Sequence, residues 1–146
     1  KQQRKRVEAV LECLGIAELA ERGFARISGG ERQLALIARA MVQGAKLLIM
    51  DEPTANLDFA NQYLILNHME ALAKRGYTVL FSTHNPDQAL SCTDRVLVLQ
   101  KGTMLAYGPS NQVLTAELLT KLYGVEVSLE ASQADPSRRI CIPLRK

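Results

Sequence analysis

Lys46-Leu47-Leu48-Ile49-Met50-Asp51-Glu52-Pro53 is the stretch of this sequence that decides its fold. A continuous apolar run that ends in an acidic pair and a proline is typical of a strand buried on both faces of a parallel sheet. We therefore expect a central strand over residues 46–50, with Asp51 and Glu52 at its carboxyl end. Because a proline disfavours the helical region for the residue before it, we also expect Glu52 to be extended.

The residues that follow predict a crossover to a second strand. Asp58 is placed to cap a helix that Gly76 ends, and residues 78–82 have the composition of another buried strand. A strand, a helix and a strand in this order form a right-handed parallel unit, so both strands end at the same edge. The inner face of the helix is expected to carry Ile65, Leu66, Met69, Leu72 and Ala73.

The shared strand edge has the residue types of a nucleotide-hydrolysing site. Ligands bind at this edge in open α/β sheets, and here it carries Asp51, Glu52, Thr83 and His84. One carboxylate can hold Mg²⁺ through water, while the other orients or deprotonates an attacking water. Taken singly, an ordinary turn after the strand and a structural histidine remain alternatives for these residues.

A second candidate site lies at the start of an upstream helix. Ser28 and Glu31 form a capping box around Gly29 and Gly30. A helix start presents unpaired N–H groups and a partial positive charge, and two glycines let an anion approach the backbone. The segment thus suits a phosphate, although helix capping alone would also explain it. An amphipathic helix over residues 4–14 precedes it, with Val7, Val10, Leu11 and Leu14 on one face.

The last third of the chain predicts a hairpin, short helices and further strands. Residues 96–99 and 103–107 flank a Lys101-Gly102 turn. Ser110 and Thr115 are placed to cap two short helices that close at Gly124. Strands are expected over residues 125–129 and 139–142.

Bulk properties exclude several classes of protein. With 146 residues, 47% hydrophobic and 23% charged, the chain has the composition of one globular body. Its apolar runs are far shorter than the roughly 18 residues of a membrane span. Cys13, Cys92 and Cys141 lack CxxC spacing, which fits a reducing compartment better than a disulfide scaffold. The chain begins at Lys1 without a methionine, so we expect an internal fragment.

Four segments in order resemble the ABC ATPase family. These are Ile27 to Gln33 (ISGGERQ), Leu47 to Pro53 (LLIMDEP), Ala55 to Asp58 (ANLD) and Thr83-His84. They are similar to the family's signature motif, Walker B strand with catalytic glutamate, D-loop and switch-histidine loop, and the resemblance covers residues 1 to about 108. One departure is Glu31, where the commonest signature has glutamine.

The resemblance implies a division of labour between two head-to-tail ATPase subunits that bind ATP and Mg²⁺. Ser28, Gly29 and Gly30 would bind the γ-phosphate of a partner's ATP, and Asp58 would lie at the dimer seam. Asp51 would hold Mg²⁺ through water. Glu52 would be the general base, and His84 would contact the γ-phosphate.

The phosphate loop itself is absent from these residues. The motif G-x-x-x-x-G-K-[ST] requires a glycine followed by lysine, and none of the nine glycines is. The glutamine loop is also missing. We therefore predict an α/β fold: a partial P-loop NTPase-like parallel sheet, without the N-terminal half that carries the phosphate loop, and with a helical signature subdomain. The expected segments are 1–45, helical with the signature; 46–108, the α/β core with Walker B, D-loop and His-loop; and 109–146, C-terminal helices and a strand.

Three functions remain open at this point. The first is the ATP-hydrolysing subunit of an ABC membrane transporter, resembling importers of the iron-chelate, haem or cobalamin type, inactive alone for lack of the phosphate loop. It implies transmembrane permease subunits as partners, no direct nucleic-acid contact, and a cytoplasmic, peripheral position on the inner face of the plasma membrane. The others are a soluble ABC-type ATPase acting on nucleic acid or ribosomes, and a non-catalytic module that completes a partner's ATP site.

Overall fold

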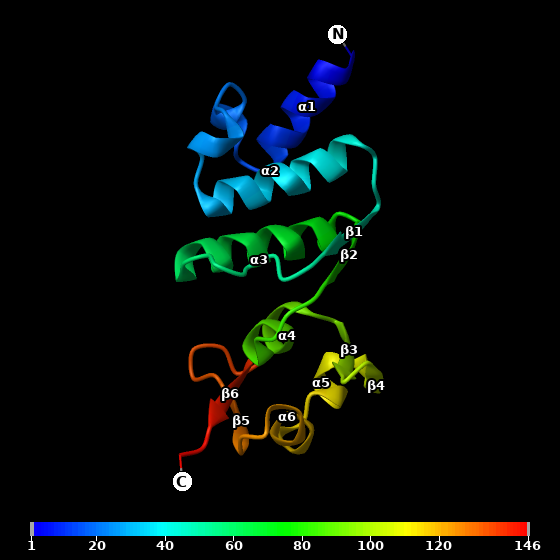
Figure 1. Ribbon diagram of the computed structural model, residues 1–146, viewed down its shortest axis with the longest axis vertical. Coiled ribbons are helices and arrows are strands. Elements are labelled where there is room, and N and C mark those ends of the chain that lie inside the picture. The colour runs from blue at the N-terminus through cyan, green and yellow to red at the C-terminus, as the bar shows by residue number, and fades with distance from the viewer. Residues whose placement is uncertain (1, 146) are drawn as a thin grey trace. The chain divides into compact units, whose positions relative to one another are not determined.

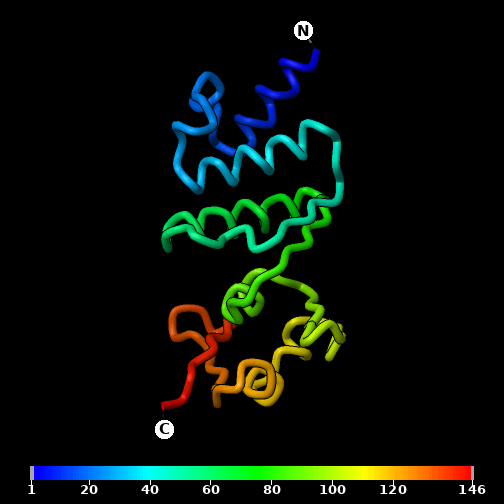
Figure 2. Tube along the Cα trace, in the orientation of Figure 1, coloured from blue at the N-terminus to red at the C-terminus, as the bar shows by residue number. Residues whose placement is uncertain are grey.

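The computed structural model describes residues 2–145 and divides into two compact units, with the boundary between Ser82 and Thr83 (Figure 1). The first unit contains a parallel strand–helix–strand crossover, as predicted: Leu47 pairs with Thr78 and Met50 with Phe81. The trace in Figure 2 runs from one long helix through the first strand into the next long helix, and these two helices pack together. The elements of this unit are α1 (Gln2–Cys13), the 3-10 turns η1 (Ala17–Leu19) and η2 (Phe24–Arg26), α2 (Gly29–Val42), β1 (Leu47–Met50), α3 (Phe59–Lys74) and β2 (Thr78–Phe81).

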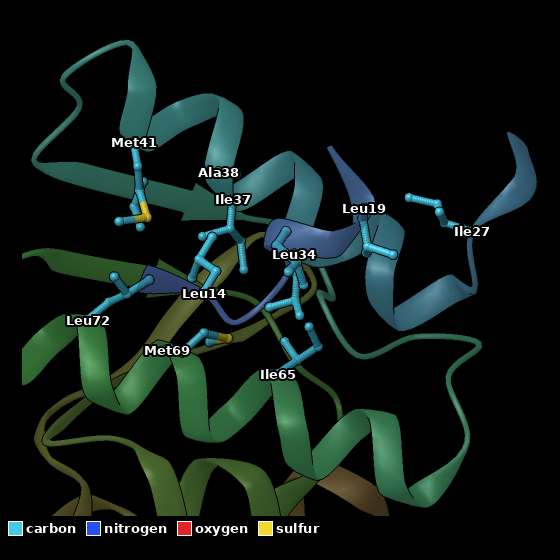
Figure 3. Close-up of a cluster of buried hydrophobic side chains, with 12 residues drawn as sticks. Leu14, Leu19, Ile27, Leu34, Ile37, Ala38, Met41, Ile65, Met69 and Leu72 are labelled. Atoms are coloured by element: carbon cyan, nitrogen blue, oxygen red, sulfur yellow. The ribbon is translucent and has the colours of Figure 1, made fainter. Parts of the chain in front are cut away.

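One apolar cluster holds the first unit together (Figure 3). Side chains of α2 and α3 meet there, and each fully buried leucine or isoleucine contributes about 1.5–3 kcal/mol relative to exposure. The buried members labelled in the figure are Leu14, Leu19, Ile27, Leu34, Ile37, Ala38, Met41, Ile65, Met69 and Leu72. The predicted inner face of α3 is confirmed except at Ala73, which is exposed. Val7 on α1 is also exposed, so the predicted apolar face of that helix is only partly buried.

The prediction that both strands are buried on both faces is wrong. Leu48 is 3% exposed, whereas its neighbours Leu47 and Ile49 are 51% and 69% exposed. On β2, Leu80 is likewise 54% exposed. Side chains alternate between the faces of a strand, and within the first unit only one face of this sheet packs against the cluster. The unit therefore leaves an apolar sheet face uncovered.

The second unit contains the predicted antiparallel hairpin and two further paired strands. β3 pairs with β4, with a register shift between Val98 and Leu99, and β5 pairs with β6. A small cluster around Val98, Leu114, Leu119 and Val127 forms its core. Its elements are α4 (Pro86–Cys92), β3 (Arg95–Gln100), β4 (Thr103–Pro109), α5 (Ser110–Val113), α6 (Ala116–Tyr123), β5 (Val127–Ala131) and β6 (Arg139–Pro143).

The predicted caps of the second unit are half right. Thr115 caps α6 by accepting a hydrogen bond from the backbone N–H of Leu118 at 3.2 Å. Ser110 caps nothing: it is the first residue of α5, and its hydroxyl donates to the carbonyl of Thr93 at 2.5 Å. Helix α4 was not anticipated, although Asn85 as cap followed by a proline at the first position is a typical helix start. Among the described residues, no helix combines the length and the apolarity that crossing a bilayer requires.

Candidate functional site

The acidic pair lies at the end of β1, where Ser82 ties it to the end of β2. The Ser82 hydroxyl donates a hydrogen bond to the Asp51 carboxylate and accepts one from the backbone N–H of Glu52 at 2.9 Å. Ser82 is a site residue that the sequence motifs do not include. The parallel register contains the signal, because Met50 pairs with Phe81 and the next residues along the two strands are Asp51 and Ser82.

Glu52 has a strained backbone, and the prediction that it is extended is wrong. Its φ is +42°, in the left-handed region that non-glycine residues rarely adopt. Two contacts fix this conformation: its N–H donates to Ser82, and its carbonyl accepts from the N–H of Ala55 at 2.9 Å. These hydrogen bonds outweigh the preference that Pro53 imposes. Strain of this kind, about 1–3 kcal/mol, clusters at functional sites, so it marks Glu52 as a candidate.

The start of α2 has the predicted capping box. The Ser28 hydroxyl accepts from the N–H of Glu31 at 3.2 Å, and the Ser28 N–H donates to the Glu31 carboxylate at 2.6 Å. The hydrogen bond from the Ser28 backbone is the main cause that lowers the pKa of Glu31, and the hydrogen bond with the Ser28 side chain is the second. Ser28 and Gly29 are exposed, whereas Gly30 is buried. Only the first two residues of the predicted phosphate segment therefore face solvent freely.

Gly30 is buried because the start of α3 packs against it. Asp58 caps α3, accepting from the backbone N–H of Asn61 at 2.9 Å and from its side-chain amide at 2.7 Å. The backbone hydrogen bond from Asn61 is the main cause that lowers the pKa of Asp58. A methyl group on Gly30 would overlap Asn61 Oδ1. The starts of α2 and α3 are therefore in direct contact through Gly30 and Asn61, and Asn61 is the contact residue that sequence reasoning missed.

His84 lies in the second unit, in the exposed turn between β2 and α4. The Thr83 hydroxyl donates to the side-chain oxygen of Gln88 at 2.9 Å and accepts from the N–H of Asn85 at 3.1 Å. From α6, the Tyr123 hydroxyl donates to the carbonyl of His84 at 2.8 Å. Asp51, Glu52 and the phosphate segment belong to the first unit, so their pairing with His84 stays a prediction.

The donor set at the end of β1 fits Mg²⁺. Within residues 2–145 no three His, Cys, Asp or Glu side chains form a group that would hold a metal by themselves. Mg²⁺ does not need one: it is commonly held by one or two carboxylates and completes its shell with water and substrate phosphates. Asp51 offers an exposed carboxylate with a hydroxyl beside it, and both are hard oxygen donors.

Comparison with known proteins supports one family. The sequence profile described as ABC transporter matches residues 1–55. The chain is 40% identical to the molybdate import ATP-binding protein MolC of Haemophilus influenzae, over 84% of this chain and 49% of the relative. It is 36% identical to the iron(3+)-hydroxamate import ATP-binding protein FhuC of Bacillus subtilis, over 86% of this chain and 47% of the relative.

A solved structure agrees with the sequence relatives. An inward-facing metal-chelate type ABC transporter matches 97% of this chain and 57% of its own with a TM-score of 0.90 and 35% identity. The chain spans about half the length of the curated relatives it matches. The α/β fold of an ABC cassette and the four ordered motifs lead to the same conclusion: this chain belongs to the ABC transporter ATP-binding family.

Proposed function

We propose that the chain forms part of the ATP-hydrolysing subunit of an ABC importer, in which ATP closes two subunits and hydrolysis reopens them. The observation that carries the proposal is the end of β1, where Ser82 holds an exposed Asp51 and a strained Glu52 side by side. The relatives named for import of molybdate and of iron(3+)-hydroxamate support the importer assignment. The segments 1–45, 46–108 and 109–146 are the proposed functional divisions.

Each site residue has a proposed role in this function. The Glu52 carboxylate takes a proton from the water that attacks the γ-phosphate, and His84 donates a hydrogen bond to that phosphate. Asp51 would hold Mg²⁺ through water, and the bound ion would supply charge neutralisation at the phosphates. Ser28 and Gly29 present the α2 amino terminus to the ATP of the facing subunit, while Gly30 allows the close packing against Asn61.

The proposed assembly follows from what these residues lack. None of their nine glycines begins a Gly-Lys pair, so the phosphate loop that holds the nucleotide comes from outside residues 1–146. The proposed partners are a second ATPase subunit, arranged head to tail across ATP, and transmembrane permease subunits. The proposed location is cytoplasmic, at the inner face of the plasma membrane, and the 146-residue chain alone is proposed to be inactive.

A chimera tests the proposal. Residues 1–146 replace the matching half of MolC, which retains its own other half, and ATP hydrolysis by the purified chimera is measured. We expect turnover that Glu52→Gln lowers by about 100-fold or more, as expected for loss of a general base. His84→Ala is expected to lower it as well. Glu130→Gln, the same change at an exposed carboxylate of β5, is the matched control and should leave turnover intact.

The opposite pattern would reject the proposal. If the chimera hydrolyses ATP and Glu52→Gln behaves like Glu130→Gln, then Glu52 is not the base. If the folded chimera with native Glu52 has no turnover while MolC itself is active, these residues do not complete an ATP site.

A further inference from the structure

Tyr123 connects the last helix of the chain to the turn that carries His84. It is the final residue of α6, and its hydroxyl donates to the His84 carbonyl oxygen at 2.8 Å. Both residues belong to the second unit. None of the four motifs that identify the family includes Tyr123, so motif reading assigns it no role.

Helix α6 is a firm support for this hydrogen bond. Leu119 is 1% exposed in the core of the unit, and Gly124 ends the helix in a left-handed conformation with φ +70°. The Thr120 hydroxyl accepts from the N–H of Val127 at 3.2 Å, and the Gln100 side chain donates to the carbonyl of Leu122 at 3.3 Å. The end of α6 is therefore hydrogen-bonded to both β5 and β3, which restrains the backbone that carries the Tyr123 ring.

The His84 turn is held from two sides. On the α4 side, Thr83 contacts Gln88, which is 7% exposed, and Asn85 caps the helix by accepting from the N–H of Asp87 at 2.9 Å. On the α6 side, Tyr123 holds the carbonyl of the histidine itself. Burial, and secondarily Cys141, raises the pKa of the Tyr123 phenol, so the hydroxyl stays protonated and able to donate at neutral pH.

We propose that Tyr123 is a positioning residue for His84: its hydroxyl fixes the peptide group of His84 and thereby the direction of the imidazole. The inference rests on the proposed function, in which His84 contacts the γ-phosphate. The His84 carbonyl and the Asn85 N–H belong to one peptide group, and both are hydrogen-bonded, so the Cα–Cβ direction from which the imidazole projects is restrained. Removal of one hydrogen bond lets this peptide plane rotate and shifts the position of the imidazole. Movements in the segment from α6 to β6 would then change the orientation of His84.

The test uses the 146-residue chain labelled with ¹⁵N-histidine and ¹³C-carbonyl. The sequence has two histidines, so His68 of the first unit is an internal reference for His84. Tyr123→Phe removes only the hydroxyl. Tyr107→Phe is the matched control, because its hydroxyl is likewise held by one hydrogen bond within the second unit: it accepts from Arg95 at 3.1 Å.

We expect Tyr123→Phe to move the His84 carbonyl carbon upfield and to broaden the His84 imidazole signals, with His68 unchanged. Hydrogen exchange at the Asn85 amide should speed up about tenfold, the equivalent of one net hydrogen bond. Tyr107→Phe should do neither. Unchanged His84 signals in Tyr123→Phe, or the same changes in Tyr107→Phe, would overturn the inference.

A second measurement covers the case in which Tyr123→Phe unfolds the unit. Incorporation of 3-fluorotyrosine makes each phenol a stronger donor while the chain keeps its sequence. The His84 carbonyl carbon should then move downfield, and a carbonyl that does not respond would overturn the inference.

The chimera separates this inference from the proposed function. Tyr123→Phe should lower kcat for ATP about tenfold with KM unchanged, and it should have no further effect in a His84→Ala background. An equal loss in that background would overturn positioning through His84. If His84→Ala alone leaves turnover unchanged while the spectra respond as expected, the proposed role of His84 is rejected and its contact with Tyr123 stands.

Discussion

At the scale of single residues, the backbone of Glu52 is the feature with the clearest consequence. Glu52 is the proposed general base, and its backbone is in the left-handed region. The sequence predicted its place at the end of the strand but not its conformation, because the rule for residues before proline is local. The Ser82 contact comes from a residue 30 positions away.

The strain at Glu52 predicts that a glycine variant at this position is more stable than an alanine variant, the reverse of the usual order. In ordinary positions glycine is less stable than alanine by about 0.5–1 kcal/mol. At a φ of +42° alanine retains the strain and glycine relieves it, so Glu52→Gly should be more stable than Glu52→Ala by about 1 kcal/mol. Urea unfolding of the two variants measures the difference. The usual order, alanine above glycine, would show that Glu52 is not strained in solution.

His68 on α3 predicts a pH dependence of the first unit. Burial is the main cause that lowers the pKa of His68 below its usual 6.5, and the positive charge of Arg75 is the second. Between that lower pKa and 6.5 the unfolded chain binds a proton that the folded chain does not, so stability falls as the pH drops through this window. Above 6.5 both states are neutral and the effect vanishes. Urea midpoints measured from pH 7.5 to 5.5 should show the loss, and His68→Gln should flatten it. An equal slope in the variant would assign the dependence to other groups.

At the scale of elements, the starts of α2 and α3 are interlocked. Sequence reasoning identified both caps, Ser28 and Asp58, because capping depends on residues within one turn. It did not find the packing of Gly30 on Asn61, because that contact depends on how two helices approach each other. The crossover and the hairpin could also be predicted, because the sequence pattern within each segment indicates strands and turns. The exposure of Leu47 and Ile49 could not, because the pattern does not show which other elements cover a strand.

The interlock predicts that Gly30→Ala destabilises the first unit. The added methyl group would overlap Asn61 Oδ1, and the Asn61 amide is held in place by Asp58 at 2.7 Å. Overpacking of this kind costs about 1–3 kcal/mol. Gly23→Ala is the matched control, because a methyl group there meets nothing within 4 Å. Thermal unfolding should separate the two variants, and Asn61→Ser should recover part of the Gly30→Ala loss. Equal stability of Gly30→Ala and Gly23→Ala would contradict the packing.

At the scale of the whole molecule, the main feature is the apolar sheet face that the first unit leaves exposed. Leu47, Ile49 and Leu80 form an apolar surface on a two-stranded parallel sheet whose strands pair only with each other among the described residues. Contiguous apolar surfaces and unpaired strand edges favour self-association.

The exposed sheet face predicts concentration-dependent association of the 146-residue chain. Threonine is β-branched and favours strands, so replacement of Leu47, Ile49 and Leu80 by threonine should preserve the strands and shift sedimentation towards a monomer. Val7→Thr changes an isolated exposed side chain on α1 and should leave association unchanged. A wild-type chain that is monomeric at every concentration would contradict this prediction.

ATP turnover by the purified 146-residue chain, with and without Glu52→Gln, tests the central claim most directly. We propose that the hydrolytic carboxylate lies on this chain and the phosphate loop outside it, and we therefore expect no turnover by either form. Turnover by the wild-type chain that Glu52→Gln abolishes would show that these residues hold the nucleotide unaided, and would contradict the account.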